Sequence, residues 1–141
     1  MVKEVVVRPN GSPKFARGNG IVTTLLVCKE RCGAANFTSG MTKIPAEMAV
    51  PLHSHNCDEH VTVIEGKADA EIDGKHFLME LQDTAFIPEG VPHRFINVGK
   101  VSLSILWVYG TDKPTRTITE TGETVAHLST TYEAKGTSES K

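Results

Sequence analysis

Short runs of β-branched and apolar residues, each bounded by glycine or proline, recur along this 141-residue chain. No stretch shows helical periodicity of useful length, so the pattern is typical of an all-β sandwich or barrel. The pair Asp73-Gly74 stands between two extended runs and favours a tight type I′ hairpin, because both positions tolerate positive φ angles. The predicted strands are Val2–Arg8, Ile21–Val27, Asn36–Thr42, Ala49–His53, His60–Glu65, Lys67–Ile72, Lys75–Leu78, Thr84–Ile87, His93–Asn97 and Val101–Tyr109, with Thr115–Thr119 as a further edge strand.

The length suits a single domain, which we place at residues 1–133, followed by a small, polar tail at 134–141 that we expect to be disordered. The 15 basic residues nearly balance the 17 acidic ones, so nothing in the charge favours nucleic acid or an anionic membrane as a partner. No apolar run approaches the roughly 20 residues needed to span a bilayer, and the N-terminus does not resemble a signal peptide. The three cysteines are odd in number, which argues against a closed disulfide framework, so the expected compartment is the cytoplasm.

Three of the six histidines fall between His53 and His60. In an extended backbone His53 and His55 point to the same face, because strand side chains alternate with period two. Glu59 follows across a short turn and can face the same space, and a Pro/Gly turn at 88–92 delivers His93 to the start of another strand. Imidazoles and a carboxylate gathered in this way suit a divalent transition metal: Fe, Mn, Co, Ni, Cu or Zn.

These two stretches resemble the two sequence motifs of the cupin superfamily. The first motif, His-x-His-x3-Glu-x6-Gly, is matched by His53, His55, Glu59 and Gly66. The later part of the second, Pro-x-Gly-x2-His-x3-Asn, is matched by Pro88, Gly90, His93 and Asn97. The resemblance covers about residues 37–109. Two turn positions at which the family usually has glycine carry Glu47 and Gln82 in this chain.

The resemblance implies a small single-domain cupin, which is a double-stranded β-helix or jelly-roll barrel. It also implies that His53, His55, Glu59 and His93 converge on one metal ion, which leaves open positions for water, substrate or dioxygen. The favoured interpretation is an Fe(II) dioxygenase-type oxidoreductase acting on a small organic molecule. Two alternatives stay open: a Lewis-acid isomerase, lyase or decarboxylase with Mn, Ni or Zn, and a non-catalytic cupin that binds a sugar or other small molecule.

Cupins commonly dimerise through edge strands, so the resemblance also implies a homodimer. The two predicted strands that are free for exchange or augmentation are Val2–Arg8 and Thr115–Thr119.

Several residues near the motifs are expected to have structural or surface roles. His60 neighbours Glu59 and therefore faces the other way on a strand, towards the surface. Cys57 falls at the turn and is expected to be a free thiol rather than a ligand. Surface positions are predicted for Glu47, His76, Arg94 and His127; Asn97 is predicted to be structural; and core packing is favoured over a place in the pocket wall for Phe37, Met41, Met48, Phe95 and Trp107.

Overall fold

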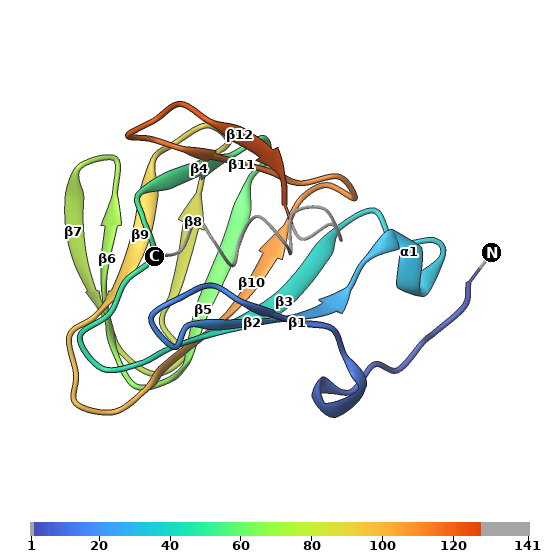
Figure 1. Ribbon diagram of the computed structural model, residues 1–141, viewed down its shortest axis with the longest axis horizontal. Coiled ribbons are helices and arrows are strands. Elements are labelled where there is room, and N and C mark those ends of the chain that lie inside the picture. Colours follow the sequence, from blue (N-terminus) through green and yellow to red (C-terminus); the bar gives the residue numbers. More distant parts are fainter. Residues whose placement is uncertain (1, 128–141) are drawn as a thin grey trace.

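Two six-stranded antiparallel sheets build the protein, whose computed structural model describes residues 2–127 (Figure 1). The first sheet contains, in spatial order, β1 (Lys14–Ala16), β2 (Val22–Val27), β3 (Thr38–Ile44), β10 (Leu103–Tyr109), β5 (Glu59–Glu65) and β8 (Thr84–Ile87). The second contains β12 (Thr124–Ala126), β11 (Thr115–Ile118), β4 (His53–His55), β9 (His93–Asn97), β6 (Ala68–Ile72) and β7 (Lys75–Met79). The predicted all-β jelly roll is confirmed, and the predicted tail at 134–141 lies outside the described residues.

Two short helical turns, η1 (Pro9–Gly11) and α1 (Lys29–Cys32), complete the secondary structure of residues 2–127. Neither is long or apolar enough to cross a membrane.

The core lies between the inner faces of the two sheets. Along β10, buried residues alternate with half-buried ones, as expected for a strand with one face turned inward. Val61 and Val63 of the first sheet and Ala68 and Ala70 of the second have no exposed surface. Burying a valine side chain stabilises a fold by roughly 1.5–3 kcal/mol, so these positions hold the sheets together.

The predicted core positions agree with the structure in part. Phe95 and Trp107 are almost fully buried, and Met41 is half-buried. Phe37 and Met48 are 44% and 39% exposed, so the prediction that they pack in the core was wrong. Phe37 precedes β3, and Met48 lies in a turn, where no sheet periodicity directs a side chain inward.

Glycine is required at the end of the first motif. Gly66 connects β5 to β6 with a φ of +74°, and a Cβ atom there would lie 2.5 Å from the carbonyl oxygen of Ser102. The next connection is the predicted type I′ hairpin: Asp73 and Gly74 have φ angles of 54° and 77°, and Ile72 pairs with Lys75. These two turns fix the register of β6, which lies beside the strand of His93.

Asn97, the last residue of the second motif, has a structural role, as predicted. Its buried side-chain amide donates hydrogen bonds to the carbonyl oxygens of Ile44 and Val101, each at 2.9 Å. Its side-chain oxygen accepts from the Gly99 backbone N–H, and its own backbone N–H donates to the Met48 carbonyl. One side chain therefore satisfies backbone groups of two separate segments, the end of β3 and the loop at 99–101.

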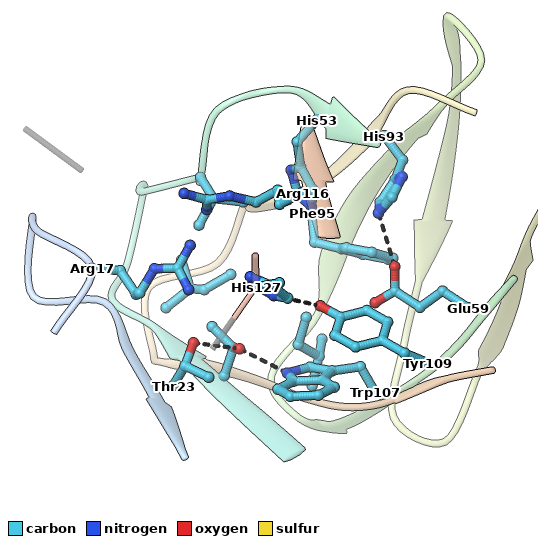
Figure 2. Close-up of a pocket in the computed structure, with 14 residues that line it drawn as sticks. Arg17, Thr23, His53, Glu59, His93, Phe95, Trp107, Tyr109, Arg116 and His127 are labelled. Carbon is cyan, nitrogen blue, oxygen red and sulfur yellow. Dashed lines mark hydrogen bonds and ion pairs between the residues drawn. The ribbon is translucent and has the colours of Figure 1, made fainter. Parts of the chain in front are cut away.

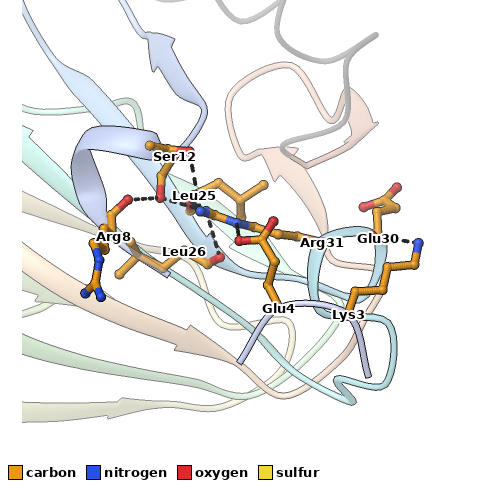
Figure 3. A network of polar contacts seen from close by, with 9 residues as sticks. Lys3, Glu4, Arg8, Ser12, Leu25, Leu26, Glu30 and Arg31 are labelled. Atoms are coloured by element: carbon orange, nitrogen blue, oxygen red, sulfur yellow. Dashed lines mark hydrogen bonds and ion pairs between the residues drawn. The ribbon is translucent and has the colours of Figure 1, made fainter. Parts of the chain in front are cut away.

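The predicted strand at residues 2–8 was wrong, because that segment pairs with no strand of the described chain. The edge of β2 is covered by β1 at residues 22–24. The segment is instead attached to α1: the Lys3 backbone N–H donates to the Cys32 carbonyl, and Glu4 pairs with Arg31 at 3.2 Å (Figure 3). The further expectation that this segment pairs with a second copy stays a prediction.

Four described residues other than glycine have left-handed backbone, and two of them lie in the turns that precede β4 and β8. Glu47 (φ 66°) and Gln82 (φ 73°) occupy the positions at which glycine is usual in the family. The Met48 N–H donates to Pro45 and the Asp83 N–H donates to Glu80, so both residues hold the third position of a four-residue turn, where type II geometry favours glycine. A side chain in this conformation costs roughly 1–2 kcal/mol.

We therefore predict that Glu47→Gly and Gln82→Gly each raise the free energy of unfolding by about 0.5–1 kcal/mol, since relief of strain exceeds the entropy that glycine adds to the unfolded chain. Urea denaturation of each variant measures this change. Leu81→Gly is the matched control, because Leu81 lies in the same turn without a positive φ and its replacement should destabilise the protein. A Gln82→Gly variant no more stable than wild type would contradict the prediction.

Candidate metal centre

Three short strand segments bring the predicted ligands together. His53 and His55 lie on β4, His93 begins β9, and Glu59 begins β5. Both histidines of β4 are buried while Ser54 between them is half-buried, so they share the inner face as predicted. The register between β4 and β9 brings the third histidine beside them, because His53 is paired directly with His93. All four residues are more than nine-tenths buried.

The loops that carry the two motifs are tied to each other. The Gly90 backbone N–H donates to the carbonyl oxygen of His55 at 2.9 Å. The Glu89 N–H donates to the carboxylate of Asp58, also at 2.9 Å. The Pro/Gly turn before β9 is thus hydrogen-bonded both to the end of β4 and to the loop that leads into β5.

Hydrogen bonds to the backbone set the orientation of all three imidazole rings. The Nδ1–oxygen pairs are His53 to Pro51 at 2.7 Å, His55 to Thr115 at 2.9 Å and His93 to Val91 at 2.9 Å. A carbonyl oxygen can only accept, so each Nδ1 carries the hydrogen and each Nε2 keeps its lone pair. This is the arrangement found around metal-binding histidines, in which the second ring nitrogen is fixed by a partner outside the metal's own ligands.

The three histidines form the group whose potential ligand atoms all lie within 4.8 Å of one another. Glu59 is not a member of that group, but its Oε1 lies 2.9 Å from His93 Nε2 and 3.5 Å from His55 Nε2. Although they are this close, Oε1 and both Nε2 atoms lack hydrogen-bond geometry and are buried without a hydrogen-bond partner. Neighbouring donors around a metal bound at about 2.1 Å lie roughly 3 Å apart, so buried donors at this spacing fit a divalent ion.

Burial and mutual proximity determine the charge of the rings. Burial, reinforced by the neighbouring histidines, lowers the pKa of His53 well below its ordinary value. Burial also lowers the pKa of His55, although the charge of Glu59 acts in the opposite direction. For His93 the effect of burial is outweighed by the carboxylate of Glu59, 2.9 Å from its Nε2, so its pKa is raised. Among the three histidines, Glu59 therefore interacts most strongly with His93.

A small cavity of about 50 Å³ adjoins the cluster, enough for roughly three to five water molecules. Its wall includes His53, His93 and Glu59 together with Phe95 and Trp107 (Figure 2). Phe95 and Trp107 are therefore both core and cavity wall.

Four further cavity residues were not found from the sequence: Arg17, Tyr109, Arg116 and His127. The prediction that His127 is solvated was wrong. His127 is 9% exposed, its backbone N–H donates to Pro114, and its Nε2 lies 2.9 Å from the Tyr109 hydroxyl. His127 directly follows β12, an edge strand, and its neighbours in the sequence are therefore polar. Only the pairing of β12 with β11 turns its side chain inward.

The remaining predicted positions agree with the structure. His60 and His76 are exposed, and so is Glu47, which is not part of the cavity wall. Arg94 points away from the cavity, and its Nε pairs with Glu71 at 2.8 Å. Cys57 is a buried free thiol whose pKa is raised to about 11 by burial, so it stays uncharged at neutral pH.

We predict that the metal-free protein loses stability as the pH falls from 7 to 5. His53, His55 and His127 have lowered pKa values in the folded state, so below about 6.5 the unfolded chain binds protons that the folded chain does not. The raised pKa of His93 offsets only part of this. The free energy of unfolding should decrease by about 1–2 kcal/mol per pH unit.

Urea denaturation at a series of pH values measures this slope. His127→Gln should reduce the slope, and the exposed His76→Gln should leave it unchanged. A metal-free protein that becomes more stable on acidification would contradict the assignment of neutral buried rings.

Comparison with known proteins agrees with this geometry. A family model described as a cupin domain matches residues 40–109, which include both motifs. A curated relative, an uncharacterized protein of Methanocaldococcus jannaschii, is 33% identical over 50% of this chain and 62% of its own length. The chain thus spans less than two thirds of that relative.

Two solved structures illustrate the likeness in fold. A RmlC-like cupin from Shewanella frigidimarina superposes with a TM-score of 0.65 at 15% identity, covering 77% of this chain and 91% of the other. A mutant of oxalate decarboxylase from Bacillus subtilis gives a TM-score of 0.69 at 18% identity, covering 76% of this chain and 30% of the other. At these identities the likeness establishes the fold alone.

Proposed function

Since the chain belongs to the cupin family, we propose that it is a metal-dependent enzyme of the Fe(II) dioxygenase type that acts on a small organic molecule. One observation carries the proposal. Three buried imidazoles, each fixed through Nδ1 by a backbone carbonyl, turn Nε2 towards a shared space that a buried carboxylate also enters. Stability alone does not account for such a cluster, because buried polar atoms without partners cost free energy.

The proposed ligands are Nε2 of His53, His55 and His93 and a carboxylate oxygen of Glu59. Nitrogen and oxygen donors of this kind suit Fe(II), with Mn, Co, Ni, Cu and Zn as alternatives. When bound, the metal supplies Lewis acidity and, as Fe(II), a position for dioxygen beside the substrate. The carboxylate of Glu59 balances part of the metal's charge, and the backbone carbonyls keep the rings in place.

The other cavity residues exclude water and hold protons. Phe95 and Trp107 form apolar walls beside the proposed ligands, which limits the water that reaches them. Tyr109 and His127 share a buried hydrogen bond at 2.9 Å next to the His55 ring. The pKa of His127 is lowered well below its ordinary value by burial and by His55, so its ring stays neutral, and the hydrogen bond holds one proton between Tyr109 Oη and His127 Nε2.

The metal is tested by elemental analysis of the purified protein. We predict about one transition metal ion per chain in the wild type and none in a variant carrying both His53→Ala and His93→Ala. Chelation should lower the unfolding temperature of the wild type but not of the variant, since a ligand that binds only the folded state stabilises it. The control is His60→Ala with His76→Ala, which removes two exposed histidines. Full metal content in the first variant would show that the ligands are wrongly assigned.

Lewis-acid chemistry is the second candidate. One structural neighbour favours it: oxalate decarboxylase from Bacillus subtilis, which has Mn(II) centres. That protein is 19% identical to this chain, so it supports the candidate only through the fold.

The requirement for dioxygen distinguishes the dioxygenase from the Lewis-acid enzyme. Fe(II)-loaded and Mn(II)-loaded protein would each be incubated with a panel of small organic acids and sugars, in air and under strict anaerobiosis. We predict that Fe(II)-loaded protein consumes a compound only in air, with matching oxygen uptake, as followed by NMR and an oxygen electrode. Turnover of that compound without oxygen would instead support the Lewis-acid candidate, and binding that survives metal removal without turnover would support a binding protein.

A further inference from the structure

Strand β7 is the free edge of the second sheet. Within residues 2–127 it pairs only with β6, and Figure 1 shows it at the outside of the sheet. Four of its five residues are exposed, including Phe77 at 50% and Leu78 at 65%. These two neighbours point to opposite faces of the sheet, so the strand is apolar on both faces. An edge of this kind favours pairing with a further strand.

The other strands that end the two sheets are less open to pairing. β1 and β12 have only three residues each, and β8 has four and is followed directly by Pro88. Short strands and proline are two of the features that prevent sheet edges from pairing. β11, which the sequence predicted as an edge strand, is covered by β12, and residues 2–8 form no strand. Among the described strands, β7 is therefore the edge most open to a partner.

An apolar surface continues from β7 to β8. Phe77, Leu78, Leu81 and Phe86 are each between 50% and 66% exposed. With about 200 Å² for a fully exposed side chain of this size, the four leave roughly 500 Å² uncovered. A stable dimer buries about 800 Å² on each copy, so these side chains supply more than half of the area that is needed. A cleft of about 430 Å³ also opens between the two strands, with Phe77, Met79 and Phe86 in its walls.

The hairpin of β6 and β7 determines which backbone groups of β7 are left at the edge. Its two-residue turn, Asp73-Gly74, is flanked by a hydrogen-bonded pair of residues, and such pairs alternate with non-hydrogen-bonded ones along an antiparallel ladder. The odd-numbered residues of β7 therefore direct their N–H and C=O groups to β6. Those of His76 and Leu78 are directed to the open edge.

One register lets two copies of β7 use all four of these groups. His76 of each copy lies opposite Leu78 of the other in an antiparallel pairing about a two-fold axis, which forms four hydrogen bonds. A shift in one direction would require Gly74, which lies in the turn. A shift in the other direction would require Glu80, whose N–H and C=O groups are already bonded to Asp83.

We propose that the protein forms a two-fold dimer in which β7 pairs antiparallel with β7 of a second copy. Phe77 then meets its own counterpart in a non-hydrogen-bonded pair, in which side chains lie closest together. Lys75 meets Met79, so no two like charges are directly opposite along the seam. Phe77 of the second copy shares the face that lines the cleft, and it covers the mouth of the cleft. The inference is independent of the proposed metal chemistry.

Disulfide cross-linking tests the register. Phe77→Cys is made together with Cys32→Ser, which leaves only the two buried thiols of the wild type. In the proposed dimer the Cβ atoms at position 77 lie roughly 4.5–5.5 Å apart, so mild oxidation should join the chains in pairs on a non-reducing gel. Lys75→Cys is the matched control, because it lies on the same face of the same strand. Its two copies would lie about 14 Å apart, so this variant should stay unlinked.

The mass in solution tests the association itself. Size exclusion with light scattering should give the mass of two chains for the wild type. Phe77→Lys removes an aromatic contact and places two lysines opposite each other, so it should weaken dimerisation tenfold or more. Val5→Lys is the control: Val5 is 83% exposed and lies in the segment 2–8, outside the seam, so dimerisation should be unchanged.

Three outcomes would overturn the inference. The first is a wild type that is monomeric at about 100 μM, which excludes a dissociation constant in the micromolar range. The second is cross-linking of Lys75→Cys as efficient as that of Phe77→Cys. The third is a dimer that Val5→Lys dissociates and Phe77→Lys does not, which would place the interface at residues 2–8. The wild-type mass needs no substitution, so a variant that fails to fold does not leave the question open.

Discussion

The candidate site depends on the pairing of β4 with a strand on each side. β4 has only three residues, and on its own it has too few hydrogen bonds to be stable. Pairing with β9 places His53 opposite His93, and pairing with β11 places His55 opposite Arg116. The carbonyl that fixes the His55 ring belongs to Thr115, on that same neighbouring strand. The sheet therefore positions both the donors and the groups that orient them.

Gathering these groups is costly, and the rest of the fold offsets that cost. Three buried imidazoles, a carboxylate and two guanidinium groups lie where water cannot solvate them fully. The low pKa values of His53 and His55 express that cost, because the rings stay neutral rather than charged. The aliphatic core of fully buried valine and alanine residues supplies stability elsewhere between the sheets. Such a division is common where function requires polar groups in an apolar interior.

The sequence predicted the elements with strong local patterns and missed those that depend on a partner. Period-two alternation located the strand that contains His93, and the pair Asp73-Gly74 located the hairpin between β6 and β7. The same reasoning failed for residues 2–8, whose β-branched composition permits a strand although no strand of the described chain pairs with them. Propensity describes what a backbone tolerates, whereas a strand also requires an unpaired neighbour.

The sequence by itself determined the all-β class and the cluster of histidines, since alternation and the spacing of two motifs are properties of neighbouring residues, and its resemblance to the cupins implied the jelly roll. Only the tertiary structure placed Arg17, Tyr109, Arg116 and His127 around the same cavity. These residues come from four separate segments, and no local period relates them. What unites them is the register of the two sheets, and register is decided by hydrogen bonds between strands far apart in the chain.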